Sequence, residues 1–327
     1  LPNLAGHVSG IAWRDRQTIV YSADVGVTST LGEVRLDGSG RKTRIPETTG
    51  LVVRGFTQAA LSGDAAFVVN TPHHPPEVYL LKHAGGDPKR LTQSNPWLKD
   101  VRLAEQEAVT FKARDGLRLE GILVRPLDYE PGKRYPLILA VHGGPETHVA
   151  DGWVTSYTRP GQMAAARGFA VFYPNYRAST GRGVAFSKLD HGDPAGAEFD
   201  DLVDAVDHLI AGGLADRDRV GVTGGSYGGY ASAWGATYYS ERFAAAVMFV
   251  GISNAVSKAG TTNIPEEIYE VHHRRRVWDD WQFFLERSPI YYVKKARTPI
   301  LILHGRNDPR VHPSQSLELF RLLKLQG

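Results

Sequence analysis

The sequence predicts an α/β domain with a mostly parallel sheet covered by helices on both faces, preceded by a short all-β region. From about residue 105 onward, runs of continuously apolar residues alternate with helical segments. That alternation is typical of parallel strands whose two faces are both buried. Before residue 94, short strands and turns follow one another without a helical period. These two patterns divide the chain into two regions of different architecture.

The first region, residues 1–93, contains the same succession of four short strands twice. Turn sequences such as Asp37-Gly38-Ser39-Gly40 and Gly85-Gly86-Asp87-Pro88 fall at matching places in the two copies. A four-stranded repeat of about 45 residues predicts two β-propeller blades. A generic β-meander is the alternative. The expected strands are 7–14, 18–25, 32–37 and 42–45 in the first copy, and 53–61, 65–69, 77–82 and 89–91 in the second.

Residues 94–104 read as a linker, because Asn95-Pro96 interrupts the strand pattern. The second region, 105–327, opens with a hairpin that turns at Asp115-Gly116. Apolar strands and a helix follow, so the expected order is that of a parallel sheet with crossover helices. The expected elements are the hairpin strands 108–113 and 117–125, the parallel strands 135–141, 169–173, 219–223, 245–250 and 299–304, and the helix 198–211.

The helix at 198–211 has one apolar stripe, which supports a two-faced sheet with helices packed against it. Its four aspartates are expected to face water, and Gly212-Gly213 to end it. The stripe consists of Phe199, Leu202, Val203, Val206, Leu209 and Ile210, and the aspartates are Asp200, Asp201, Asp204 and Asp207.

Composition limits the class of protein. With 327 residues, 42% hydrophobic and 22% charged, the chain has the make-up of a soluble globular protein. A net charge of +3 and scattered basic residues give no indication of a nucleic-acid partner. The one basic run, 272–276, favours a solvated surface over an anion site. The longest apolar run, 243–252, is about half of a membrane-spanning helix, so no membrane partner is expected.

The sequence gives no indication of a cofactor or of a metal site. It contains no cysteine, which excludes disulfides and thiolate metal sites and leaves the redox compartment open. Histidines and carboxylates show no ligand spacing, and His73-His74 lies in a proline-rich turn. Because Leu1 is not an initiator methionine, the natural start is expected upstream, and cytoplasmic and periplasmic or secreted locations both stay open.

The stretch Gly224-Gly225-Ser226-Tyr227-Gly228 carries the main chemical signal. It is a G-x-S-x-G sequence between an apolar strand and a helix, the pattern of a nucleophile elbow in α/β-hydrolases. Such a turn exposes the hydroxyl of Ser226 and turns the backbone N–H of Tyr227 toward a developing oxyanion. A phosphate-binding loop is disfavoured, because Tyr230 stands where the P-loop lysine is required. The sequence therefore predicts a serine hydrolase.

Two further strand ends carry matching signals. His142-Gly143-Gly144-Pro145 follows the strand 135–141, where α/β-hydrolases place the second oxyanion donor. We assign this role to the N–H of Gly144, a tight turn without ligand being the alternative. Asp308 follows the strand 299–304, downstream of Ser226, as the acid does in the order Ser, Asp, His. The alternative for Asp308 is a helix cap near Pro313.

Several segments resemble the prolyl oligopeptidase (S9) family of serine peptidases, closest to its acylaminoacyl-peptidase and dipeptidyl-peptidase branch. The resemblance implies a propeller followed by a hydrolase domain, with Ser226 as nucleophile, Asp308 as triad acid and Arg310 as a substrate-contacting arginine. Ala178 departs from the family's usual glycine, and His312 from a frequent proline. The matching segments are 175–183, 224–230, 287–290 and 304–311.

The histidine of the triad is the missing part of this pattern. Only 19 residues follow Asp308 (327 − 308), and 313–325 reads as one helix. His312 lies too close to Asp308 in the chain to serve as the base, and His142 and His304 are expected to have packing roles. Two blades are also fewer than a closed propeller needs. We therefore expect an internal fragment of a longer peptidase, inactive by itself.

The expected activity of the whole protein is cleavage of short peptides, with a homo-oligomer left open. An esterase or lipase of the same fold is one alternative, and a non-catalytic scaffold is another. The segment 253–286 is expected to form a specificity wall. In it, Glu266 and Glu267 are candidates for binding a peptide's amino terminus or simply solvated, and Trp278, Trp281, Phe283 and Phe284 for lining a pocket or packing a helix.

Overall fold

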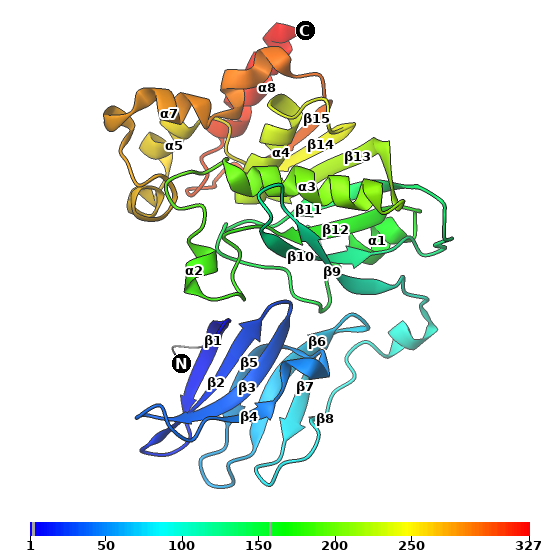
Figure 1. Cartoon of the computed structure of the whole chain (residues 1–327), viewed down its shortest axis with the longest axis vertical. Helices are drawn as coiled ribbons and strands as arrows, with labels where there is room; N and C mark the ends of the chain where they lie inside the picture. Colours follow the sequence, from blue (N-terminus) through cyan, green and yellow to red (C-terminus); the bar gives the residue numbers. More distant parts are fainter. Residues whose placement is uncertain (2–3, 157) are drawn as a thin grey trace.

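The computed structural model describes residues 1, 4–156 and 158–327. It contains two four-stranded antiparallel sheets and one seven-stranded sheet flanked by helices. Figure 1 shows the two small sheets next to each other below the larger sheet, with the amino terminus at the small sheets and the carboxyl terminus at the far end of the larger one. The two architectures expected from the sequence are both present.

The small sheets follow the order of the chain, β1-β2-β3-β4 and β5-β6-β7-β8. Most strands lie within three residues of their expected bounds, but β3 begins four residues early, at Thr28. Gly26, with φ 57°, and Val27 alone make the turn from β2, so the hairpin is tighter than the sequence indicated. The strands are β1 (His7–Trp13), β2 (Thr18–Val25), β3 (Thr28–Arg35), β4 (Lys42–Ile45), β5 (Val52–Gln58), β6 (Ala65–Thr71), β7 (His74–Leu81) and β8 (Lys89–Arg90).

The large sheet has the order β15-β14-β13-β11-β12-β10-β9. The strands β11 to β15 run parallel to one another. The hairpin of β9 and β10 extends the sheet at one edge, where β10 pairs antiparallel with β12. Since the parallel strands end at one edge, the loops after them converge there. The strands are β9 (Gln106–Lys112), β10 (Arg118–Val124), β11 (Tyr135–Val141), β12 (Ala170–Asn175), β13 (Ala215–Gly225), β14 (Ala245–Phe249) and β15 (Ile300–Leu303).

Helices cover both faces of this sheet, as the continuous apolar strands require. On β11, Leu137 and Leu139 pack into the core formed with α3 (Ala197–Ala211) and α4 (Tyr227–Thr237). Ala140 packs on the opposite face with α1 (Gly161–Ala165). The remaining helices are α2 (Val184–Ser187), α5 (Ala255–Thr261), α6 (Pro265–Glu267), α7 (Trp281–Glu286) and α8 (Ser314–Gln326). No described helix has the length and apolar character needed to cross a membrane.

One expectation for α3 is wrong. Asp201 does not face water but is fully buried, where its carboxylate binds Arg177. Arg177 donates to Asp201 through Nη2 at 2.7 Å and through Nε at 2.9 Å. This bidentate ion pair compensates the cost of burying the carboxylate. It also connects the loop after β12 to α3. The helical period does not predict such a pair, because a charged residue next to the apolar stripe is expected to face water.

Candidate active site

Ser226 lies at the end of β13 and at the start of α4, in an unusual backbone conformation with positive φ, at φ 58° and ψ −118°. This conformation is costly for a residue with a Cβ, by about 1–3 kcal/mol, and is held in place only by its surroundings. The N–H of Ser226 donates to the carbonyl of Phe249 on β14, at 3.0 Å. The elbow expected from the G-x-S-x-G sequence is therefore present, anchored to the neighbouring strand.

Close backbone contacts hold the elbow against the end of β11. A Cβ on Gly224 or on Gly228 would overlap the carbonyl oxygen of Val141. Both positions thus require glycine, because the two backbones approach more closely than any side chain allows. This contact brings the loop after β11 next to Ser226.

The loop after β11 places Gly143 and Gly144 beside the serine. A Cβ on Gly143 would lie 3.3 Å from the Cβ of Ser226 and 3.7 Å from the backbone nitrogen of Tyr227. Gly144, with φ 125°, lines the same cavity as Ser226 and Tyr227. The two amides assigned to the oxyanion hole are therefore in the neighbourhood of the serine.

His142 holds this loop rather than taking part in chemistry. Its Nδ1 lies 2.9 Å from the carbonyl oxygen of Gly143, and its Nε2 lies 2.9 Å from Ser179 Oγ. The ring stacks on Tyr176, with centroids 4.3 Å apart. Burial lowers the pKa of His142 to about 3, so the ring is neutral at ordinary pH.

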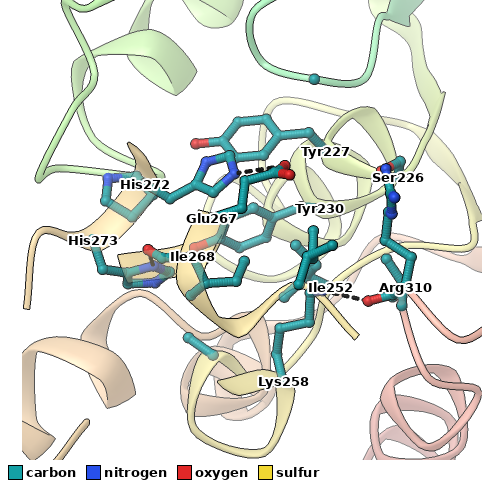
Figure 2. Close-up of a pocket in the computed structure, with 15 residues that line it drawn as sticks. Ser226, Tyr227, Tyr230, Ile252, Lys258, Glu267, Ile268, His272, His273 and Arg310 are labelled. Carbon is teal, nitrogen blue, oxygen red and sulfur yellow. Dashed lines mark hydrogen bonds and ion pairs between the residues drawn. The ribbon is translucent and has the colours of Figure 1, made fainter. Parts of the chain in front are cut away.

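A cavity of about 190 Å³ opens in front of Ser226. One part of its wall is apolar, and Figure 2 shows polar side chains on another part, with Lys258, Glu267, His272 and His273 from the segment after β14 and Arg310 from the loop after β15. The Arg310 side chain extends toward Ser226 in this view, and its contact with substrate stays a prediction. The apolar lining includes Tyr230, Ile252, Ala255, Ile264, Ile268 and Val311, and the polar lining includes Lys258, Glu267, His272, His273 and Arg310.

Two polar features mark this wall. The Nζ of Lys258 donates to the Oγ1 of Thr262 at 2.9 Å and to the carbonyl of Arg310. Burial lowers the pKa of Lys258 to about 8, although the charge of Asp308 opposes this shift. Glu267 Oε1 lies 3.8 Å from His272 Nε2, and Glu267 lines the cavity while 48% of its side chain stays exposed. Figure 2 marks this pair with a dashed line.

The basic run 272–276 is only in part the solvated surface that the sequence favoured, because the Arg274 side chain is 49% exposed but the two histidines are not. His272 and His273 are buried, with 5% and 6% of their surfaces exposed. His272 stacks on Tyr227 and His273 on Phe284, so the start of the run belongs to the cavity wall. Phe284 is buried as well, whereas Trp278 and Trp281 are exposed and contribute to neither the pocket nor a core.

Asp308 lies in the loop after β15, at the same edge of the sheet as Ser226. Its Oδ1 accepts the backbone N–H groups of Arg310 and Val311, at 2.9 and 3.0 Å. Arg310 and Val311 both line the cavity, so Asp308 shapes the part of the wall next to the serine. The carboxylate is turned inward, with 22% of its side chain exposed.

In the described part of the chain, no histidine hydrogen-bonds the hydroxyl of Ser226. His304 lies 3.8 Å from Asp308 Oδ2, but its Nε2 donates to the carbonyl of Val311 at 2.7 Å. Its Nδ1 lies 2.6 Å from Ser316 Oγ, so both ring nitrogens are occupied. His312 contacts Ser314. The contacts of His304 agree with the packing role expected for it, whereas His312 is exposed at the surface.

A buried acidic group behind the elbow escaped the sequence analysis. The hydroxyl of Tyr227 donates to Glu198 Oε1 at 2.8 Å, and Glu198 also accepts the N–H groups of Ala195 and Gly196. Burial, reinforced by the charge of Asp190, raises the pKa of Glu198 to about 8. Asp190 itself is buried, which together with Glu146 raises its pKa to about 7. The only sequence signal was a glutamate at the start of a helix, where solvation is usual.

Comparisons with known proteins find matches to both the sequence and the fold. A model of the prolyl oligopeptidase family matches residues 155–327. The chain is 36% identical over 261 residues to the uncharacterised peptidase YuxL of Bacillus subtilis, covering 79% of this chain and 39% of that protein. It is 32% identical over 260 residues to dipeptidyl aminopeptidase BIII of Pseudoxanthomonas mexicana, covering 76% of this chain and 37% of that protein.

Among solved structures, an acylaminoacyl peptidase in complex with Z-Gly-Gly-Phe-chloromethyl ketone superposes with a TM-score of 0.87 at 25% identity. The match covers 99% of this chain and 50% of that chain. It confirms the expected fold, an α/β-hydrolase preceded by two propeller-blade-like sheets. The chain spans half the length of this structure and less than two fifths of the curated relatives.

Proposed function

Because the chain belongs to the prolyl oligopeptidase family of serine peptidases, we propose that Ser226 is the nucleophile of a peptidase acting on short peptides. The observation that carries this proposal is the position of Ser226. It sits on a strained elbow, faces a cavity, and has the glycine loop of β11 packed against its Cβ. Strain of this kind persists where it orients a reactive group.

The proposed chemistry is acyl transfer to water. A base removes the proton from Ser226 Oγ, the oxygen attacks the peptide carbonyl, and the amine leaves with a proton. Water then hydrolyses the ester formed on Ser226 and regenerates the hydroxyl. The N–H groups of Gly144 and Tyr227 stabilise the negative oxygen of each tetrahedral intermediate, and Asp308 orients the base.

The cavity supports a peptide with an apolar residue at the cleaved bond. Its walls include Tyr230, Ile252 and Ile268, which can pack against an apolar side chain of the substrate. The inhibitor in the solved acylaminoacyl peptidase, Z-Gly-Gly-Phe-chloromethyl ketone, likewise ends in phenylalanine. Arg310, at the cavity edge, is proposed to bind a substrate carbonyl or carboxylate.

The absence of a histidine bonded to Ser226 in the described residues leads to a proposal about rate. A serine without its base is a weak nucleophile, and comparable losses reduce kcat by on the order of 10⁶. The 327-residue chain is therefore expected to hydrolyse peptides very slowly. Its elbow and oxyanion groups should still direct a strong electrophile to Ser226.

The test is labelling of the purified chain with a fluorophosphonate probe, followed by mass spectrometry of the labelled peptide. We expect slow modification at Ser226 and none in Ser226→Ala, with Ser232→Ala as a control because Ser232 lies in the same helix but is buried. Labelling spread over several serines would contradict the assignment. Rapid hydrolysis of a Z-Gly-Gly-Phe anilide that Ser226→Ala abolishes would support Ser226 as the nucleophile. It would contradict the proposal that this chain lacks a base for Ser226. Preference for p-nitrophenyl esters over peptides would favour the esterase alternative.

A further inference from the structure

Glu146, Asp190 and His191 come together although they belong to two separate loops. One oxygen of each carboxylate and one imidazole nitrogen all lie within 4.8 Å of one another. The two loops border the candidate active site, since Gly144 and Pro194 line its cavity. The sequence predicted no metal cluster, because the three residues lie in two loops that are distant in the chain and come together only in the folded structure.

Asp190 is the unusual member of this group. Only 2% of its surface is exposed, and neither Oδ1 nor Oδ2 has a hydrogen-bond partner among the residues that the structure describes. Buried carboxylates are normally paired or hydrogen-bonded, because desolvation strongly disfavours an isolated charge. The charge of Glu146 close by makes a bare carboxylate still less favourable. A ligand with positive charge would remove both costs.

We propose that Glu146, Asp190 and His191 bind a divalent transition-metal cation. Two carboxylates and one imidazole suit Zn²⁺ best, with water in the fourth position, while Mn²⁺ is the harder cation compatible with the same set. His191 Nε2 and Glu146 Oε1 are 3.3 Å apart. Two ligands of a tetrahedral zinc ion with bonds of about 2.0–2.1 Å have about this separation.

Arg274 is the group that opposes the cation. Its Nη2 donates to His191 Nδ1 at 3.2 Å, so without metal the Nε2 of His191 carries the proton and donates to Glu146. When a cation takes Nε2, the proton moves to Nδ1, and Arg274 must leave that nitrogen. The Arg274 side chain is about half exposed, at 49%, so it can turn toward solvent.

The bound cation would stabilise the oxyanion loop. Glu146 follows Gly144 by two residues, and Asp190 and His191 precede Pro194 on the other side of the cavity. Tying the two loops through one ion fixes the backbone of Gly144 relative to the cavity wall. The inference does not rest on the proposed peptidase function, because binding is measured without substrate.

The experiment is a titration of the chelator-treated full chain with ZnCl₂, and separately with MnCl₂, by calorimetry and by thermal unfolding. We expect one equivalent of at least one cation to bind, with a rise in Tm that grows with metal concentration. Asp190→Asn should reduce affinity at least tenfold while keeping the fold, since it removes a buried charge without changing shape. The matched control is Asp218→Asn, because Asp218 is exposed and outside the cluster.

Two further variants sharpen the result. His191→Gln should lose binding in the same way, and it replaces Asp190→Asn if that variant fails to fold. Arg274→Gln should bind the cation several-fold more tightly, because it removes the competing positive charge. Binding of neither cation, or binding that Asp190→Asn and His191→Gln leave unchanged, would overturn the proposal.

Discussion

At the scale of single residues, Glu198 supports the elbow from behind. Its carboxyl group accepts hydrogen bonds from the Tyr227 side chain and from two backbone N–H groups, and it is fully buried. The side chain that it anchors belongs to the residue whose backbone N–H is assigned to the oxyanion hole. A buried acid therefore fixes the orientation of the Tyr227 side chain, next to the cavity in front of Ser226.

This acid should give stability a particular pH dependence. Burial raises the pKa of Glu198 to about 8 in the folded chain, against about 4.5 when unfolded. Between these values the folded chain retains a proton on Glu198 that the unfolded chain has lost. The stability that Glu198 contributes is therefore fully present below pH 4.5 and is lost as the pH rises toward 8. The contribution is at most roughly 5 kcal/mol across this window.

Glu198→Gln cannot titrate and should therefore flatten this slope. Urea unfolding at pH 5, 6.5 and 8 measures it, with Glu241→Gln as the control at an exposed position. The amide also places an N–H₂ group next to the hydrogen-bond donors that Glu198 accepts. We therefore expect the free energy of unfolding to fall by about 1–3 kcal/mol at every pH, in addition to the change of slope. Equal slopes in wild type and Glu198→Gln would show that Glu198 is already ionised in the folded chain.

At the scale of elements, the start of α4 depends on backbone contacts that only glycine permits. A methyl group on Gly228 would overlap the carbonyl of Val141 and lie 3.1 Å from that of His142. Those atoms belong to the end of β11 and the loop after it, which packing on both sides prevents from moving. We therefore expect the helix start, Ser226 and the loop after β11 to behave as one rigid unit.

Gly228→Ala should accordingly destabilise the chain by about 1–3 kcal/mol through overpacking, and reduce labelling of Ser226. The matched control is Gly260→Ala, because Gly260 also lies in a helix but has open space where its Cβ would be. That change should stabilise by about 0.5–1 kcal/mol, since alanine favours helix. Chemical denaturation compares the two variants, and a Gly228→Ala protein as stable as wild type would contradict the rigid unit.

Helices and strands were predictable from the sequence where the spacing of apolar residues within one segment determines the element. The apolar run of β11 and the stripe of α3 gave their positions within a residue. The serine elbow was predictable because glycines and a serine are local to one turn. Burial of Asp201, His272 and Asp190 was not, because each depends on a partner or a wall supplied by a distant segment. Family membership, expected from motifs in the second half, is confirmed.

At the scale of the whole molecule, the small sheets contact two loops of the hydrolase domain, the loop after β11, which contains Gly143 and Gly144, and the loop after β12. The N–H of Gly26 donates to the carbonyl of Gly181 at 2.7 Å, and Val27 packs into the core around α1. The Oδ1 of Asn70, on β6, accepts the N–H of Trp153 at 2.8 Å. Blade residues thus hold the segment that follows Gly143 and Gly144.

Asn70 should be the most sensitive point of this junction, because it is buried and supplies the acceptor for Trp153. Asn70→Ala leaves that N–H without a protein partner, at a cost of about 1–3 kcal/mol. We expect faster hydrogen exchange in residues 147–153 and unchanged exchange in the central strand β13, since the loss is local. Asn95→Ala is the control, because Asn95 makes no side-chain cap bond at the helical turn that it precedes. Exchange in 147–153 that stayed as slow as in wild type would show that the blades do not order the loop after β11. Burial of Val149 and Val154 against the sheet would then be enough to order this loop.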